Sequence, residues 1–219
     1  MREETPRGNC HAHKIGYGAA TGDIIVAMSD DARLVAGWAD KALAFLQERE
    51  KQNPLLSVGL HRMDFLIGTV FGLYYPYYPF VRRSTLEAVG GYFSDDYRAH
   101  FTDPDLALRI WSAGGRCEIL PERVLQIVER APGAASVGTP MKGTALAQDM
   151  ATFLSRWGDR YGRGWDLSHL RGFNLDIRGL MQLCLVRDHT VHFNDPRLVE
   201  LWQNFQRNHV LYHDDMLDN

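Results

Sequence analysis

The stretch Asp23-Ile-Ile-Val-Ala-Met-Ser-Asp-Asp31 joins a short apolar run to three polar residues. An apolar run of this length is typical of a buried strand, and we expect one over residues 23–28 that ends in Ser29-Asp30-Asp31. In open α/β sheets, ligands collect outside the carboxyl ends of the strands. The stretch therefore indicates an α/β core with a ligand site beside Asp30 and Asp31.

Two roles compete for Asp31. A hard divalent ion such as Mg²⁺ takes one or two carboxylates and completes its shell with substrate phosphates. A cation would also offset the repulsion between the adjacent carboxylates of Asp30 and Asp31. Alternatively, Asp31 caps a helix that starts near Ala32. The residues alone leave both interpretations open.

Hydrophobic spacing predicts helices and strands along the rest of the chain. The expected core elements are a helix with Leu34, Trp38, Phe45 and Leu46 on one side that Asn53-Pro54 ends, a strand over 55–60, a short helical turn over 84–89 and a strand over 116–120. Residues 131–143, rich in Gly, Ala, Ser and Pro, are expected to form a loop or lid. Helical spacing from about residue 145, over 177–187 and from Asp195 predicts a helical tail.

Asp103-Pro-Asp105 opens another predicted helix, which ends at Gly114-Gly115. Asp103 is well placed as the cap residue. A cap Asp at the mouth of a cleft can also accept a proton from a substrate hydroxyl, and the two roles are compatible because a carboxylate has two oxygens.

Residues 71–80 contain four tyrosines and two prolines, which predicts a rigid aromatic loop. Tyr77 and its neighbours can stack on sugar faces, as can Trp111, for which core packing is the alternative. The apolar window 65–81 is interrupted by two glycines and two prolines, so it does not favour a bilayer span. Peripheral membrane contact stays open.

The net charge, the N-terminus, the cysteines and one histidine pair each bear on which classes of protein are expected. The 219 residues carry 24 Lys plus Arg and 27 Asp plus Glu, and the net charge of −3 argues against a nucleic-acid binder. The polar N-terminus is not a secretory signal. Cys10, Cys117 and Cys184 are too far apart for a zinc site and suit a cytoplasmic protein with reduced thiols. His11-x-His13 is a weak metal pair on an expected loop, and it leaves a metal hydrolase as a remote alternative.

Three segments together resemble the inverting glycosyltransferases of family 2. They are Ala19-Ala-Thr-Gly-Asp-Ile-Ile-Val-Ala-Met-Ser-Asp-Asp31, Val89-Gly-Gly-Tyr-Phe-Ser-Asp-Asp-Tyr97, and Thr102-Asp-Pro-Asp-Leu-Ala-Leu-Arg109 followed by Ala113-Gly114. The order and spacing agree over roughly residues 9–130. The resemblance implies a GT-A-like (Rossmann-like) mixed α/β sheet over residues 1–143, followed by a C-terminal helical extension over 144–219.

The resemblance also implies the site. Asp103 becomes the general base, and Asp31 the ligand of a divalent cation, Mn²⁺ or Mg²⁺. Asp30 and Lys14 belong to the donor side, and Gly91, Trp111 and Tyr77 to the acceptor side. The implied partners are a nucleotide-sugar donor and a saccharide or lipid-linked saccharide acceptor. Polysaccharide assembly in the cytoplasm, at the inner face of a membrane, fits this reading.

The sequence departs from the family pattern at several places. Ser29 stands where the first Asp of Asp-x-Asp is usual, Thr102 where Glu is usual, and Glu129 near the place of a common His. The family's first strands, which bind the nucleotide, have no counterpart upstream, and at about 30 residues per βαβ unit the difference is on the order of 60 to 80 residues. We therefore expect an N-terminally truncated core. The alternative to an enzyme is a noncatalytic relative that binds saccharide or a partner, with a homodimer or a complementing chain covering the sheet edge.

Overall fold

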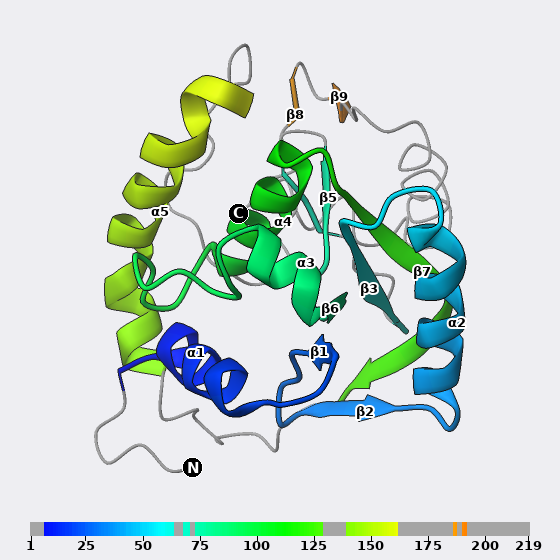
Figure 1. Cartoon of the computed structure of the whole chain (residues 1–219). Helices are drawn as coiled ribbons and strands as arrows, with labels where there is room; N and C mark the ends of the chain where they lie inside the picture. The colour runs from blue at the N-terminus through cyan, green and yellow to red at the C-terminus, as the bar shows by residue number, and fades with distance from the viewer. Residues whose placement is uncertain are drawn as a thin grey trace.

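The computed structural model describes residues 7–63, 68–70, 73–128 and 139–161, with 186–187 and 190–191. A five-stranded mixed sheet has the order β1-β6-β3-β7-β2 (Figure 1). Its strands are β1 (Ile24–Val26), β6 (Pro79–Arg82), β3 (Leu56–Arg62), β7 (Arg116–Ile127) and β2 (Ala32–Leu34). The central pair β3 and β7 is parallel, and every other neighbouring pair is antiparallel. Two small hairpins stand apart from this sheet: β4 (Gly68–Val70) with β5 (Leu73–Tyr75), and β8 (Val186–Arg187) with β9 (Thr190–Val191).

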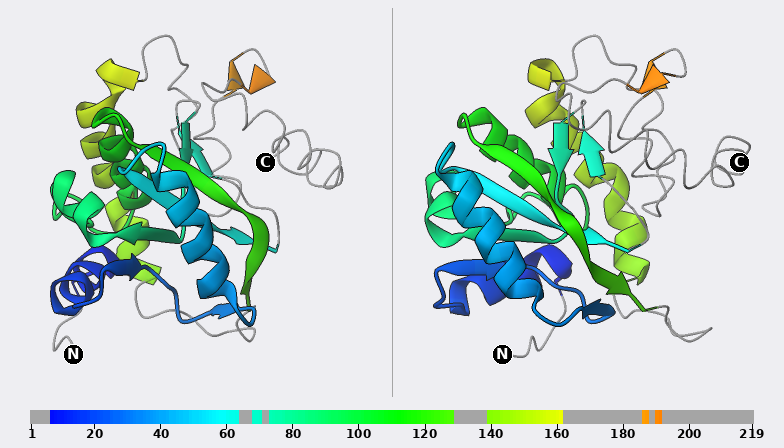
Figure 2. Two further views of the ribbon diagram at one scale, coloured as in Figure 1. Left: turned by 45° about the vertical axis from the view of Figure 1, so that its right-hand side comes forward. Right: turned by 90° about the vertical axis from the view of Figure 1, so that its right-hand side faces the viewer.

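Helices cover both faces of the sheet (Figure 2). They are α1 (Asn9–Ala19), α2 (Trp38–Glu50), α3 (Arg83–Ala88), α4 (Thr102–Ser112) and α5 (Thr139–Tyr161). On one face, α2 packs Leu46 against the strands, in a core with Val58 and Leu120. On the other face, α3, α4 and α5 share a second core.

The alternation of side chains along the strands produces these two cores. Neighbouring residues of a strand point to opposite faces, so Phe80 joins the core under α2 while Val81 joins the core under α4 and α5. Leu56 and Val58, two residues apart, are both fully buried on the α2 side. The fold therefore has two hydrophobic layers, one on each side of a single sheet.

Most expected core elements are confirmed. The strand over 55–60 is β3, the turn over 84–89 is α3, and the first strand is present but shortened to 24–26. The strand expected over 116–120 continues through Pro121 to Ile127. The strand continues because the pairing of β7 with β3 shifts between Gly59 and His61, as at a β-bulge. Proline has no N–H to donate, and a bulge is a position in a strand where it is tolerated.

The expectation of a helix beginning near Ala32 is wrong. Residues 32–34 form β2, because the amides of Val35 and Val128 bond to the carbonyls of Val124 and Asp31 and hold this segment against β7. The helix begins at Trp38, after Gly37 in the left-handed conformation (φ 72°). Asp31 therefore caps no helix, and Leu34 is a strand residue.

Three further expectations need correction. The segment 71–80 is not a loop throughout, because residues 73–75 form β5 and Pro79 begins β6. The N-terminal segment with the two histidines is the helix α1 and not a loop. Residues 139–143 are the first turn of α5 and not part of a lid, while 131–138 lie outside the described residues. The helix expected over 177–187 falls outside them too, except that its last two residues are in β8, and the helix expected from Asp195 lies wholly outside.

Two smaller points concern thiols and membranes. Cys10 and Cys117 are free and buried, and Cys184 lies outside the described residues. Among the helices that the structure describes, none combines the length and apolar character needed to cross a bilayer.

Candidate active site

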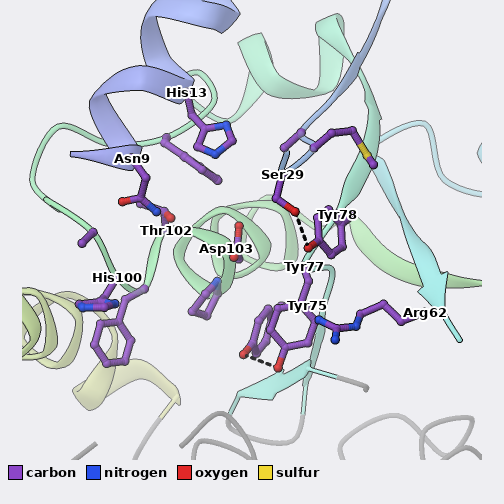
Figure 3. A pocket seen from close by; sticks show the side chains of 16 residues that line it. Asn9, His13, Ser29, Arg62, Tyr75, Tyr77, Tyr78, His100, Thr102 and Asp103 are labelled. Atoms are coloured by element: carbon purple, nitrogen blue, oxygen red, sulfur yellow. Dashed lines mark hydrogen bonds between the residues drawn. The ribbon is translucent and has the colours of Figure 1, made fainter. Parts of the chain in front are cut away.

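A cavity of about 300 Å³ opens where α1, the segment after β1, the loop before β6 and the first turn of α4 meet (Figure 3). Asp103 lies at its centre in this view, with the tyrosine hydroxyls, His13 and Ser29 around it. Its lining residues are Asn9, His13, Ala27, Met28, Ser29, Arg62, Tyr75, Tyr77, Tyr78, Phe93, Ala99, His100, Phe101, Thr102, Asp103 and Pro104.

Asp103 has the protonation behaviour of a base near neutral pH. Burial raises the pKa of its carboxyl from 3.8 to about 7, because a carboxylate loses hydration there. No described residue forms a hydrogen bond or an ion pair with this carboxylate, although Asp103 lines the cavity. Its oxygens are thus available to a ligand.

The backbone around Asp103 corrects the expected cap. Helix α4 begins at Thr102, and its cap position is Phe101, which adopts the left-handed conformation (φ 63°) without a side-chain cap. Asp103 is therefore the second residue of the helix, where the positive end of the helix dipole favours its anionic form. Phe101 is the sole described non-glycine residue with positive φ, and its ring stacks on Phe153 of α5 with centroids 5.1 Å apart. This packing stabilises a conformation that bulky residues rarely adopt.

Helix α5 holds the loop in front of α4. The carboxylate of Asp149, fully buried, accepts hydrogen bonds from the amides of Arg98 (3.0 Å), Ala99 (2.9 Å) and His100 (2.8 Å). Three consecutive amides bound by one carboxylate leave this loop little freedom. Because Ala99 and His100 line the cavity, Asp149 shapes the wall beside Asp103 from a distance.

Asp105, the second aspartate of Asp103-Pro-Asp105, connects several elements of the fold. Asp105 is fully buried and forms ion pairs with Arg109 (2.9 Å) and with Arg156 of α5 (3.0 Å). It also accepts hydrogen bonds from Tyr97 Oη (3.0 Å) and Trp157 Nε1 (2.9 Å). Arg109 in turn donates to the carbonyls of Val89, Gly91 and Tyr92. The motif thus separates its two carboxylates: Asp105 ties α4 to its surroundings, and Asp103 faces the cavity.

A hydrogen-bond chain leads toward Asp31 on the other side of the cavity. The hydroxyl of Ser29 donates to Asp31 Oδ1. Since that hydroxyl has a single proton, Tyr78 Oη, 3.0 Å away, must be the donor to Ser29 Oγ. Burial raises the pKa of Tyr78, and the negative charges of Asp31 and Asp103 raise it further. Tyr78 therefore remains neutral and lies within electrostatic reach of both carboxylates.

Aromatic and basic side chains form the rest of the wall. The rings of Tyr75 and Tyr77 meet edge to face with centroids 5.2 Å apart, and Arg62 lies beside them (Figure 3). Burial lowers the pKa of His13, whose ring packs on the edge of Phe93. The cavity thus combines apolar faces, a carboxylate and one guanidinium, a composition suited to a polyol with a charged group.

The structure brings only part of the expected site together. Asp103 and Tyr77 line the cavity, and Asp31 is one hydrogen bond from Ser29, which lines it too. Asp30 is exposed. Lys14 lies on α1, where it pairs with Asp95 and lines a different depression.

Gly91 and Trp111 make contacts within the fold, away from the cavity. The carbonyl of Gly91 is bound by Arg109, and Gly91 itself adopts a positive φ of 100°. Trp111 Nε1 donates to the carbonyl of Tyr74 at 3.0 Å, and its ring packs at the border of the core. Neither residue lines the cavity.

Nothing in the described ranges gathers three His, Cys, Asp or Glu side chains into a metal-binding group. Of the two histidines of His11-x-His13, only His13 lines the cavity. Glu129 lies outside the described residues. A cation at Asp31 would therefore take most of its ligands from a substrate, which is how Mg²⁺ commonly binds beside phosphates.

Sequence reasoning missed several residues of the site. Arg62 and His100 had no motif signal, because a strand end and a loop bring them to the cavity only in three dimensions. Tyr78 was among the tyrosines expected to stack on a sugar, but its hydrogen bond with Ser29 was not expected. Asp149 was also missed. A carboxylate among the apolar positions of a helix such as Leu146, Met150 and Phe153 is the one signal that would have indicated a buried role for it.

The curled mixed sheet, with the helices that follow it and the site at one sheet end, is the fold of a GT-A glycosyltransferase domain. No protein-family model matches the chain, and no curated protein matches it either. Among solved structures, it is similar to the crystal structure of GalNAc-T7 with UDP, GalNAc and Mn²⁺, with a TM-score of 0.58 and 13% identity. The match covers 95% of this chain and 46% of the other, so this chain spans about half the length of that relative. The likeness establishes a GT-A-like fold and does not single out family 2.

Proposed function

We propose that the protein transfers a sugar from a nucleotide-sugar donor to a hydroxyl acceptor, with inversion at the anomeric carbon and Asp103 as the base. The observation that carries the proposal is the carboxylate of Asp103, which lies in the cavity with a pKa of about 7 and without a described partner. A base with a pKa near the working pH is best matched to remove a hydroxyl proton during attack.

In the proposed reaction, the acceptor oxygen forms a bond to the anomeric carbon from the face opposite the leaving group. The bond from that carbon to the diphosphate oxygen breaks, and its electron pair stays on the nucleoside diphosphate. The acceptor proton passes to Asp103. The rings of Tyr75 and Tyr77 offer a platform for a sugar face, and Arg62 can approach the diphosphate.

A divalent cation could bind on the donor side with one carboxylate from the protein. Asp31 offers one carboxylate, oriented by Ser29, and the substrate phosphates would supply further oxygens. When bound, the cation would offset the charge on the departing diphosphate. GalNAc-T7 was crystallised with Mn²⁺, which supports testing that ion first.

The test measures release of nucleoside diphosphate from a panel of nucleotide sugars with Mn²⁺, with and without saccharide acceptors. Asp103→Asn should lower turnover by about 10²–10⁴-fold. Asp95→Asn is the matched control, because that carboxylate pairs with Lys14 away from the cavity. Equal turnover of the Asp103→Asn variant and the unmodified protein would refute the assignment of the base.

A noncatalytic saccharide-binding protein is the second candidate. The tyrosine wall of the cavity favours it, because ring faces can hold a sugar without a donor or a cation. Calorimetry separates the two candidates: saccharide binding without metal-dependent binding of any nucleotide sugar supports the binding protein.

A further inference from the structure

One turn of α5 holds the backbone segment that leads into Asp103. The amides of residues 98–100 bond to the carboxylate of Asp149 over 2.8–3.0 Å. Next in the chain, Phe101 adopts its left-handed conformation, and its ring stacks on Phe153, one helical turn after Asp149. Helix α4 then begins at once and carries Asp103 as its second residue. A single helix therefore fixes the backbone immediately before the proposed base.

These bonds require a carboxylate at position 149. Its Oδ1 accepts from the amide of Arg98, and its Oδ2 accepts from the amides of Ala99 and His100. Asp149 is fully buried, and a buried carboxylate is costly unless hydrogen bonds compensate it. An asparagine would offer one acceptor oxygen and would turn its NH₂ group toward at least one of the N–H groups. An uncharged side chain of the same size therefore cannot make all three bonds.

The segment that Asp149 holds forms a wall of the cavity. Ala99, His100 and Thr102 line the cavity together with Asp103 (Figure 3). Burial raises the pKa of Asp103 to about 7, so the protonation of this carboxyl depends on how well the wall keeps water away from it. Movement of the loop would hydrate the carboxylate and lower its pKa toward 3.8.

We propose that Asp149 is a positioning residue of the base: through its bonds to residues 98–100 it keeps the loop in the cavity wall beside Asp103, which holds that carboxylate in place and out of bulk water. Asp149 does not line the cavity and acts only through the loop. Its hold on the loop stands on the geometry, whereas the role of Asp103 as a base rests on the proposed function.

Other titratable groups face Asp103 from the elements around it. Burial raises the pKa of the Cys10 thiol and of the Tyr78 and Tyr92 hydroxyls, and the negative charge of Asp103 raises each further. Burial lowers the pKa of His13. Further ionisable groups at the cavity are Arg62, His100 and, through Ser29, Asp31. Because several groups respond to pH, the titration of Asp103 has to be followed at its own carboxyl carbon.

The test is a ¹³C NMR titration of the aspartate carboxyl groups in the purified full chain, in which Asp103→Asn identifies the Asp103 signal. This signal should titrate near 7 in the unmodified protein. In Asp149→Asn its midpoint should fall by about one pH unit or more, because the loosened loop admits water. Asp149→Glu keeps a carboxylate on a longer side chain and should give a smaller shift in the same direction. It replaces Asp149→Asn if that variant does not fold.

Gly115→Ala is the matched control for loss of stability. It strains the start of the β3–β7 pairing, beyond the end of α4 that lies away from Asp103. The variant should lower the melting temperature and leave the Asp103 midpoint where it is. A shift that follows Asp149 and not Gly115 separates positioning from general destabilisation.

Hydrogen exchange measures the hold on the loop without any substitution. In the unmodified protein, the amides of residues 98–100 should exchange as slowly as those inside α4. In Asp149→Asn they should exchange at least about tenfold faster, while the amides of α2 keep their rates.

Turnover adds a readout that a purely structural role would not change. Asp149→Asn should lower the plateau of kcat/KM by about 10–100-fold through kcat, since the base is misplaced. It should also move the acid limb of the pH profile to lower pH, together with the NMR midpoint. Gly115→Ala should leave that limb in place.

Fast exchange of the amides of residues 98–100 in the unmodified protein would overturn the proposal. An Asp103 midpoint that the Asp149 variants leave unchanged, or that Gly115→Ala shifts equally, would overturn it as well. If no nucleotide sugar is turned over while the titration and the exchange behave as expected, the positioning by Asp149 stands and the proposed reaction fails.

Discussion

Asp105 and Arg156 form an ion pair across 3.0 Å that joins the first turn of α4 to α5. One partner is fully buried, and the other is partly exposed and also binds Asp96. Because Asp103 lies two residues before Asp105, this pair fixes the helix turn that carries the proposed base. The stability of the fold and the geometry of the site therefore depend on the same contact.

The first prediction concerns this pair. Asp105→Asn removes the carboxylate that pairs with Arg109 and one of the two that pair with Arg156, and it should lower the free energy of unfolding by about 3–5 kcal/mol. Urea unfolding measures the loss. Asp159→Asn, an exposed carboxylate of the same helix as Arg156, should change stability by less than about 0.5 kcal/mol. Similar losses in both variants would contradict the central role of Asp105.

The second prediction uses the pKa of Asp103. The folded-state pKa is about 7 and the unfolded value is near 3.8, so the folded state binds the extra proton between these values. The contribution of Asp103 to the free energy of unfolding should therefore decrease as pH rises from 4 to 7. Asp103→Asn removes that slope, and unfolding curves at several pH values compare the two proteins. Parallel curves for the variant and the unmodified protein would contradict the raised pKa.

The same group sets the expected pH dependence of turnover. A base must be deprotonated, so kcat/KM should rise about tenfold per pH unit below 7 and level off above it. Initial rates between pH 5 and 9 at fixed Mn²⁺ test this. A flat profile would show that Asp103 does not titrate in the step that is measured.

The third prediction addresses Ser29. Ser29→Ala removes the hydrogen bond that orients Asp31 and leaves Tyr78 Oη without its partner. We expect Mn²⁺ affinity in the presence of UDP to fall by about 10–100-fold, as is common when a ligand loses its orienting group. Calorimetry measures this, and Ser94→Ala is the control, because Ser94 bonds to Asp96 on the exposed side. Unchanged Mn²⁺ affinity would contradict the assignment of Asp31 as the ligand of the cation.

The fourth prediction contrasts two glycines. A methyl group on Gly115 would lie 2.4 Å from the carbonyl oxygen of Leu55, at the start of the β3–β7 pairing. Gly115→Ala should therefore destabilise the protein by about 1–3 kcal/mol. Gly158 lies in α5 with open space around it, so Gly158→Ala should stabilise the protein by up to about 1 kcal/mol. Opposite shifts in melting temperature would support both placements.

The sequence predicted the parts of the fold that local patterns encode. The run around Val58 was recognised as a strand because a mostly apolar stretch of this length is typical of a buried strand. The run around Cys117 was recognised from its place between Gly114-Gly115 and Pro121. Residues 32–34 were misread because Leu34 and Trp38 are four apart, as on a helix, while pairing with the distant β7 decides their conformation. Long-range hydrogen bonds of this kind override local propensity.

The candidate site was predictable only where a motif carried it. Asp103 was identified from its spacing and from the resemblance, and it lies in the cavity. Lys14 was placed near the phosphates on its position in the chain, but its side chain pairs with Asp95. Tyr78 and Asp149 act through partners 49 residues away, Ser29 and His100, and no pattern within a short window contains that information.

The three hydrogen bonds that Asp149 accepts from the loop of residues 98–100 have a consequence for synthesis on the ribosome. The loop of residues 98–100 is made about 50 residues before the carboxylate that binds its amides. At the usual ~5–20 residues per second, the nascent chain spends roughly 3–10 seconds with the proposed base made but its supporting helix absent. The candidate active site is thus completed only after α5 has been made, and a chain truncated before α5 should keep the central sheet sequence while lacking an ordered site.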